Sequence, residues 1–226
     1  MKTLLKEIVL SGVLAAMVSV ALAEGELMVM PATTKVFNGH DQQVTVKNMG
    51  DGPLYLKISV LKVMNPGLTP EKKVSLGDVE HPGIIASPDK LTLGPGQMRD
   101  VVLKSLFAPK QEELYRLYIV PVRSLKIDAA PANKITVPVS VAIGYGVLVR
   151  HMPPPGVQRR GWTHRCEGDG MTLENTGNVR EVFTHVVYDG TRSAQTIAVF
   201  PGTPQHFATK RMSLDIDDKT TKLECP

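Results

Sequence analysis

The fold class is decided by the stretch Ile-Thr-Val-Pro-Val-Ser-Val-Ala-Ile at residues 135–143. Every odd position in it is β-branched and apolar, and every even position is small, polar or proline. A period of two is typical of a β-strand, in which successive side chains point to opposite faces of the sheet. The sequence therefore predicts a strand with one apolar face, made by Ile135, Val137, Val139, Val141 and Ile143.

Proline in the middle of this stretch predicts that the strand lies at the edge of a sheet. Pro138 has no N–H group, so one side of the strand cannot complete a ladder of hydrogen bonds. A flat, apolar, uncharged edge strand is an aggregation hazard that proteins usually block with charged residues or bulges. Two interpretations stay open: the apolar face packs inward as ordinary core, or the edge is kept available for a partner.

The rest of the chain repeats the same pattern over shorter stretches. Alternating or apolar runs are broken by Gly, Pro and Asn at short intervals, which is typical of a β-sandwich. We therefore predict an all-β protein with strands at residues 44–47, 54–60, 101–103, 114–122, 171–173, 182–188, 197–200 and 213–216.

Three regions follow from the arrangement of these patterns along the 226 residues. Residues 1–23 have a lysine-containing start, an apolar run and the small residues of a cleavage site, as in a secretory signal peptide. The alternative, a membrane anchor, is disfavoured because the apolar run is short of the ~20 residues of a span. The proline-rich segment 151–156 predicts a stiff connector between an N-terminal domain (24–150) and a smaller C-terminal domain (151–226).

The chain has two cysteines, Cys166 and Cys225, both in the predicted C-terminal domain. In an oxidising compartment a disulfide is the default for such a pair. A redox or metal-binding role is the alternative, but no Cys-x-x-Cys motif or neighbouring histidine supports it.

No motif of an enzyme is found. The sequence lacks the signatures of a serine nucleophile, a zinc-binding helix and a phosphate-binding loop, so we predict no catalytic residue, no metal and no cofactor. The six histidines are widely separated and are interpreted as solvated loop residues, and the acidic residues near 215–218 as a site of salt bridges rather than of calcium. The net charge of +4 is scattered, which argues against nucleic acid as a partner.

Three segments carry a further signal, namely residues 27–31 (Leu-Met-Val-Met-Pro), 35–39 (Lys-Val-Phe-Asn-Gly) and 87–96 (Ser-Pro-Asp-Lys-Leu-Thr-Leu-Gly-Pro-Gly). They resemble segments of the PapD-like periplasmic chaperones. Residues 63–67, 113–118 and 174–180 are similar to the alternate branch of this family, which serves class 5 fimbriae of the CFA/I and CS1 type.

This resemblance implies a boomerang of two immunoglobulin-like β-sandwiches in the periplasm. It also implies a function, in which the chaperone lends its edge strand to fimbrial major and tip subunits (donor-strand complementation) and delivers them to an outer-membrane usher. No membrane insertion is expected after signal cleavage. Self-association through the bare edge strand is left open.

The resemblance also assigns roles to further residues. An interdomain salt bridge is expected among Glu113, Arg150 and Asp218. The two basic residues with which the classical chaperones hold a carboxylate fall on Thr34, which is followed by Lys35, and on Gly146. We therefore name Thr34 and Lys35 as the candidate anchor.

Two other classes of function remain as alternatives. A fimbrial structural subunit or surface adhesin would also be a secreted β-sandwich, but it should carry a donor-like N-terminal extension and an incomplete sandwich. A secreted enzyme on a β-sandwich scaffold would need a catalytic constellation.

Overall fold

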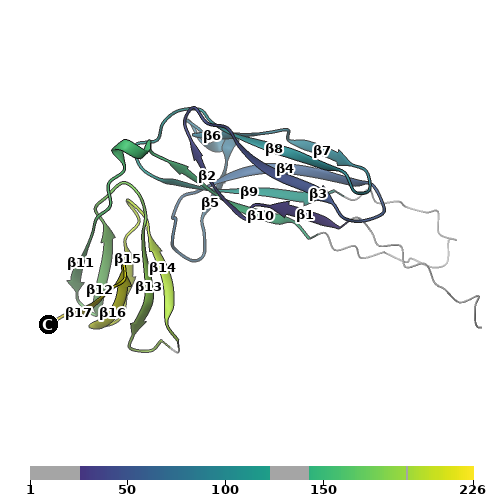
Figure 1. Ribbon diagram of the computed structural model, residues 1–226. Helices are drawn as coiled ribbons and strands as arrows, with labels where there is room; N and C mark the ends of the chain where they lie inside the picture. The colour runs from purple at the N-terminus through teal and green to yellow at the C-terminus, as the bar shows by residue number, and fades with distance from the viewer. Residues whose placement is uncertain (1–25, 123–142, 192) are drawn as a thin grey trace, which may run out of the picture.

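The computed structural model describes residues 26–122, 143–191 and 193–226. Figure 1 shows two β-rich units, which we call the N-terminal unit (β1–β10) and the C-terminal unit (β11–β17). The only helical segments in the described residues are two three-residue 3-10 turns, η1 (Leu76–Asp78) and η2 (Pro155–Val157). The all-β fold predicted from the alternating runs is confirmed.

The N-terminal unit consists of two facing sheets. One has the order β1-β3-β8-β6, and the other has the order β2-β10-β9-β4-β5, with β7 also paired to β4. The strands are β1 (Leu27–Met30), β2 (Thr33–Phe37), β3 (Gln42–Asn48), β4 (Leu54–Val63), β5 (Lys73–Ser75), β6 (Ile84–Ser87), β7 (Lys90–Leu93), β8 (Met98–Ser105), β9 (Glu113–Pro121) and β10 (Tyr145–Met152).

The C-terminal unit is a smaller pair of sheets, with the orders β11-β12-β15 and β14-β13-β16-β17. Its strands are β11 (Trp162–Glu167), β12 (Gly170–Asn175), β13 (Glu181–Tyr188), β14 (Gln195–Val199), β15 (Gln205–Phe207), β16 (Arg211–Ile216) and β17 (Lys219–Glu224).

Alternation along the strands builds each core. In β4 the side chains of Leu54, Leu56, Ile58 and Val60 are buried, while Tyr55 and the other intervening residues are more exposed. These buried residues pack with Tyr115, Leu117 and Ile119 of β9 and with Val147 and Val149 of β10, among others. The odd-numbered residues of β9 and β10 therefore face the core, and the even-numbered residues face outward.

The predicted disulfide is formed between Cys166 and Cys225, whose Cα atoms are 5.6 Å apart. Cys166 lies on β11 and Cys225 follows β17, so the bond joins the two sheets of the C-terminal unit. It closes a loop across a sequence separation of 59 residues. On the chain-entropy model a loop of this length contributes about 4 kcal/mol of stability.

The two units touch through apolar and polar contacts, which we call the domain junction. Val63 and Leu114 of the N-terminal unit pack with Phe200 of the C-terminal unit. The backbone N–H of Glu112 donates to the carbonyl of Asn178 at 2.8 Å.

Two details differ from the sequence interpretation. Strand β10 continues to Met152, so the first two residues of the predicted connector belong to the sheet, because β2 pairs with them. One of them, His151, is fully buried, and not solvated as predicted. The predicted signal peptide lies outside the described residues. No helix within the described ranges is long and apolar enough to cross a bilayer.

Candidate functional site

Strand β10 is paired on both sides along only part of its length. Residues Leu148–Met152 pair with β2 on one flank, and Tyr145–His151 pair with β9 on the other. Among the described residues, no strand pairs with the β2-side flank of residues 145–147. We call this part of the strand the open flank. Within the described ranges its backbone therefore has no partner strand on this side, as at the edge of a sheet.

The open flank directly continues the predicted edge strand. Of the five residues predicted to bind a partner, Ile135, Val137, Val139 and Val141 lie outside the described residues, and Ile143 is 73% exposed. Along the same odd-numbered face, exposure falls from Ile143 to 41% at Tyr145 and 1% at Val147. The apolar face of the strand is thus covered by core near the domain junction and uncovered at the other end.

Further apolar side chains are exposed beside this end of β10. Tyr55 of β4, Val120 of β9 and Val122 just after it are exposed, and the Val122 N–H donates to the Tyr55 carbonyl at 2.7 Å. Gly144 lies against them, because a Cβ atom added there would meet the Val120 side chain at 2.9 Å. An apolar area of this kind beside an unpaired edge is typical of a protein interaction site.

The candidate anchor residues lie on β2 and point to opposite faces. Thr34 is buried and faces the core together with Val36, so its hydroxyl is turned away from the outer surface. Lys35 is exposed and pairs in register with Arg150 of β10, on the outer face. The structure therefore leaves Lys35, but not Thr34, on the outer face, where a partner would reach it.

The partner of Arg150 is Glu112 and not Glu113. The guanidinium donates to both carboxylate oxygens, from Nε to Oε1 at 2.6 Å and from Nη2 to Oε2 at 3.0 Å. The same Oε2 accepts the backbone N–H of Arg180, in the C-terminal unit, at 2.8 Å. The Glu112 carboxylate is fully buried, and through these bonds it links Arg150 of the N-terminal unit to Arg180 of the C-terminal unit.

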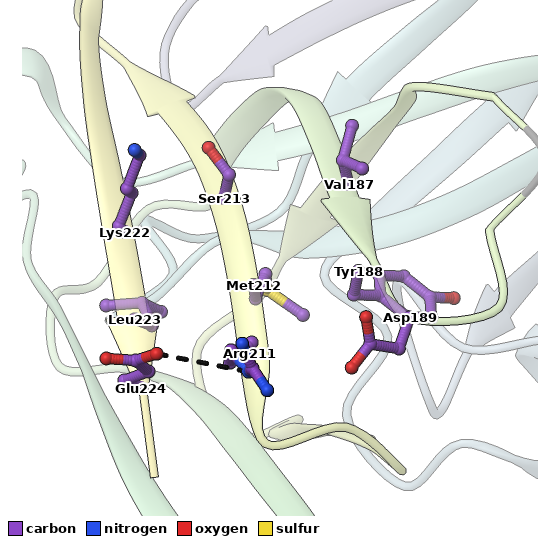
Figure 2. Close-up of a pocket in the computed structure, with 9 residues that line it drawn as sticks. All are labelled: Val187, Tyr188, Asp189, Arg211, Met212, Ser213, Lys222, Leu223 and Glu224. Atoms are coloured by element: carbon purple, nitrogen blue, oxygen red, sulfur yellow. Dashed lines mark ion pairs between the residues drawn. The ribbon is translucent and has the colours of Figure 1, made fainter.

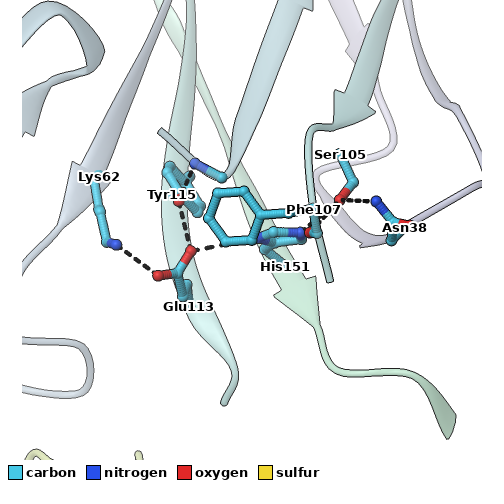
Figure 3. Close-up of polar contacts among 8 residues, drawn as sticks. Asn38, Lys62, Ser105, Phe107, Glu113, Tyr115 and His151 are labelled. Atoms are coloured by element: carbon cyan, nitrogen blue, oxygen red, sulfur yellow. Dashed lines mark hydrogen bonds and ion pairs between the residues drawn. The ribbon is translucent and has the colours of Figure 1, made fainter. Parts of the chain in front are cut away.

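Glu113 has a different role, inside the N-terminal unit. Its carboxylate accepts hydrogen bonds from Lys62 Nζ at 2.6 Å and Tyr115 Oη at 2.7 Å, and lies 3.3 Å from His151 Nδ1 (Figure 3). Burial would raise the pKa of Glu113, but the hydrogen bonds from His151, Lys62 and Tyr115 outweigh it and lower the pKa to about 2. Glu113 is thus an ionised carboxylate that holds buried polar side chains.

The same network places a serine, a histidine and a carboxylate in one row. Ser105 Oγ is 2.8 Å from His151 Nε2, on the far side of the ring from Glu113 (Figure 3). The Ser105 hydroxyl, however, donates its proton to the carbonyl of Phe107 at 2.8 Å. Because a carbonyl only accepts hydrogen bonds, the Ser105 proton is directed to Phe107 and not to His151 Nε2 in this arrangement.

The third residue of the predicted salt bridge, Asp218, lies in the turn between β16 and β17 and has no ion pair within the described ranges. Its neighbour Asp217 is 2.8 Å from Arg160, which also binds Glu181 of β13 at 2.7 Å. The salt-bridge role predicted for this acidic segment is therefore found at Asp217. Within the part of the chain that the structure describes, no group of three or more potential ligands is placed to hold a metal.

A groove of about 350 Å³ lies on the C-terminal unit, between β13, β16 and β17 (Figure 2). Its charged side chains have both signs, and Arg211 and Glu224 are 3.9 Å apart. The groove brings together no set of groups with an evident chemical role.

The alternation of side chains between the two faces of each strand would have identified Glu112 as the partner of Arg150. Glu113 is odd-numbered like the core residues Tyr115 and Leu117. Glu112 is even-numbered like Leu114, which faces the domain junction. Arg150 is also even-numbered on its strand and faces outward. The alternation therefore places Glu112, and not Glu113, on the face that Arg150 occupies.

The sequence is similar to two proteins of Escherichia coli that are named as fimbrial subunits. One belongs to the CFA/I type and is 30% identical, and the other belongs to the CS1 type and is 28% identical, each over 160 residues. The match covers 70% of this chain and 66% of each relative, so the chain spans just under two thirds of their length. No family model matches the chain.

Two solved structures have the same fold over most of the chain. One belongs to a study of the chaperone–tip adhesin complex of CFA/I fimbriae, with a TM-score of 0.69 and 21% identity. The other is the class 5 fimbriae chaperone CfaA, with a TM-score of 0.68 and 22% identity. Each covers 89% of this chain, and the chain covers 99% and 100% of them, respectively. Both units of the fold are therefore shared with these structures.

Proposed function

Since this chain has the fold of the PapD-like fimbrial chaperones, we propose that it is itself a fimbrial chaperone of the periplasm. It binds newly secreted fimbrial subunits, keeps them folded by lending them its edge strand, and delivers them to an outer-membrane usher. Its action is binding and release, without catalysis.

The single observation that carries this proposal is the open flank of β10. Tyr145–Val147 are paired on one side only within the described residues, and the apolar residues 135–143 lead directly into them. A subunit strand added here would complete two ladders of hydrogen bonds, one for each protein. The exposed Tyr145 and Ile143 would then be covered by the partner.

The energetics suit a complex that must later release its client. Burying the five apolar side chains of residues 135–143 contributes roughly 8–15 kcal/mol before any cost is counted. The loss of translational and rotational freedom and the ordering of the chains remove much of this gain. The net affinity is then high enough to hold a subunit and low enough for another strand to replace the chaperone.

The test is a double substitution on the apolar face, Val139→Asp with Val141→Asp. The expected result is loss of co-purification with a co-expressed fimbrial subunit, because two carboxylates would be buried in the subunit's core. The matched control is Thr136→Asp with Ser140→Asp, which adds the same charge at the alternate positions of the predicted strand. Capture should survive in this control. Normal capture by the Val139/Val141 variant, or equal loss in both variants, would contradict donor-strand binding.

A fimbrial structural subunit is the second candidate, because both Escherichia coli relatives are named as fimbrial subunits. A structural subunit should be found in isolated fimbriae in amounts comparable to the other components. A chaperone should be found in the periplasmic fraction and be absent from washed fimbriae. Quantitative mass spectrometry of the two fractions separates these functions.

A further inference from the structure

One loop of the N-terminal unit reaches over to the C-terminal unit. It joins β4 to β5 and comprises residues 64–72 (Figure 1). At its tip, the carbonyl of Gly67 accepts a hydrogen bond from Gln205 Nε2 of β15 at 3.2 Å. The same Nε2 donates to the carbonyl of Ala198 of β14 at 2.7 Å. Gln205 is buried, so one buried amide of the C-terminal unit holds the tip of this loop against β14 and β15.

The tip of the loop packs tightly against the C-terminal unit. A Cβ atom added to Gly67 would lie 2.5 Å from the Ala198 carbonyl oxygen and 2.7 Å from Gln205 Nε2. It would also lie 3.2 Å from Cδ2 of Phe200, whose ring is buried at the domain junction. Gly67 has a φ of +86°, a conformation that favours glycine. The close approach of the two units at this point therefore depends on a residue without a side chain.

Hydrogen bonds across the loop hold it in shape. At its base, the N–H of Met64 donates to the carbonyl of Lys72 at 2.8 Å. Farther along, the Asn65 side chain accepts the Lys72 N–H at 2.5 Å and donates to the carbonyl of Pro70 at 3.0 Å. Pro66 and Pro70 each restrict one backbone dihedral angle. A loop that is tied across in this way transmits a push on its tip to its base.

The base of the loop is fixed to the sheet that contains β9 and β10. Glu71 accepts hydrogen bonds from Arg116 of β9, the shortest at 2.6 Å from Nη2. It also lies 3.7 Å from Lys73 Nζ, which donates to Tyr118 Oη of β9 at 2.9 Å. The hydrogen bond from Arg116 lowers the pKa of Glu71, which keeps the carboxylate ionised in this pair. The loop thus connects the sheet of the open flank to the C-terminal unit.

From these contacts we infer that the β4–β5 loop is a brace that sets the orientation of the C-terminal unit, with Gly67 and Gln205 as its positioning residues. The brace is a contact of the free protein, and the inference does not rest on the proposed function. A separate segment of the N-terminal unit provides the link through Glu112, so the C-terminal unit is held at two places. Two attachments oppose a rotation that one attachment alone would allow. An orientation that is set before binding lowers the ordering cost for any partner that contacts both units.

The first test compares two glycines with similar backbone conformations. Gly67→Ala places a methyl group against the Ala198 carbonyl, and since non-bonded heavy atoms settle at roughly 3.5 Å, the contact must open by about 1 Å. Gly39→Ala is the matched control, because Gly39 has a φ of +82° in the N-terminal unit and an added Cβ there meets no described atom within 4 Å. Residual dipolar couplings of the backbone amides, measured by NMR, give the orientation of each unit.

We expect the angle between the units to change in Gly67→Ala and to stay as in the wild type in Gly39→Ala. Both variants strain a backbone with positive φ, so a loss of stability is common to both, whereas the change of angle is specific to the brace. A wild-type angle in folded Gly67→Ala would overturn the inference, because the loop would then have yielded instead of the units. An equal change of angle in Gly39→Ala would overturn it as well.

The second test leaves the loop sequence unchanged, and it decides the question if Gly67→Ala does not fold. Gln205→Met removes the amide that holds the tip and keeps an unbranched side chain of similar length. We expect the C-terminal unit of this variant to align less strongly than the N-terminal unit, whereas one alignment should describe both units of the wild type. Gln97→Met is the control, since it removes a side-chain hydrogen bond to Gly94 within the N-terminal unit. Equal alignment of the two units in Gln205→Met would overturn the inference. Neither test uses a subunit, so the proposed function stands or falls separately.

Discussion

Replacing Glu112 by alanine should destabilise the protein and loosen the domain junction. The Glu112 side chain is fully buried, and its partner Arg150 is only 11% exposed. The change leaves a buried cation without its carboxylate, and the N–H of Arg180 without an acceptor. Breaking a buried pair from one side costs about 3–5 kcal/mol. We expect a loss of this size, with Glu112→Gln less affected because one oxygen remains.

The single tryptophan makes the assay specific. Trp162 lies in the C-terminal unit, so its fluorescence follows that unit, whereas far-UV circular dichroism follows both. In urea, the two signals should separate in the Glu112→Ala variant, because the units no longer unfold together. Small-angle scattering should show a broader distribution of distances between the units.

Glu113→Ala is the matched comparison. It removes the adjacent carboxylate, which binds Lys62 and Tyr115 within the N-terminal unit. It should destabilise that unit and leave the scattering profile as in the wild type. An unfolding free energy within about 0.5 kcal/mol of wild type for Glu112→Ala, or a changed profile for Glu113→Ala alone, would refute the assignment of the junction to Glu112.

Three further results are expected. Replacing both Cys166 and Cys225 by serine should lower the unfolding free energy of the C-terminal unit by about 4 kcal/mol, measured by Trp162 fluorescence; no change in the urea midpoint would contradict this. The pKa of Glu113, lowered from 4.5 to about 2, stabilises the folded state above pH 4.5 by about 3 kcal/mol. This stabilisation should be lost as the pH falls from 5 towards 2, and Glu113→Gln should flatten the dependence; an equally steep curve in the variant would count against it. Ile143→Asp should leave stability within about 0.5 kcal/mol of wild type, because the side chain is 73% exposed, but should weaken subunit capture in a pull-down.

The strands that alternate strongly were predictable, and the others were not. Each predicted strand that lies in the described residues is present, and most are longer than the pattern indicated, as in β4 and β8. Short strands such as β5 and β15 have three residues each, too few for a period of two to appear. They are strands because a long neighbour offers them hydrogen bonds, which is a property of the folded structure.

The sequence predicted an edge strand, and the residues at the domain junction were predicted less accurately. Alternation and Pro138 indicated an edge strand, and the open flank of β10 supports that prediction up to the limit of the described residues. The sequence analysis assigned Glu113 to the salt bridge with Arg150, whereas the structure has the adjacent Glu112 there. The error arose because similarity to other sequences aligns residues without regard to the face of the strand that they occupy.

Two features that matter for the proposed binding lie on strand β10. From Leu148 to Met152, β10 is held by strands on both sides, and Arg150 fixes it to the buried carboxylate of Glu112. Within the described residues, Tyr145 to Val147 of the same strand are paired on one side only. Because Leu148–Met152 are already ordered in the folded protein, a partner that pairs with Tyr145–Val147 does not have to order that part of β10 on binding. The Arg150–Glu112 pair thus fixes the end of β10 that meets the domain junction, and the open flank lies farther from the junction, where the proposed partner would pair with it.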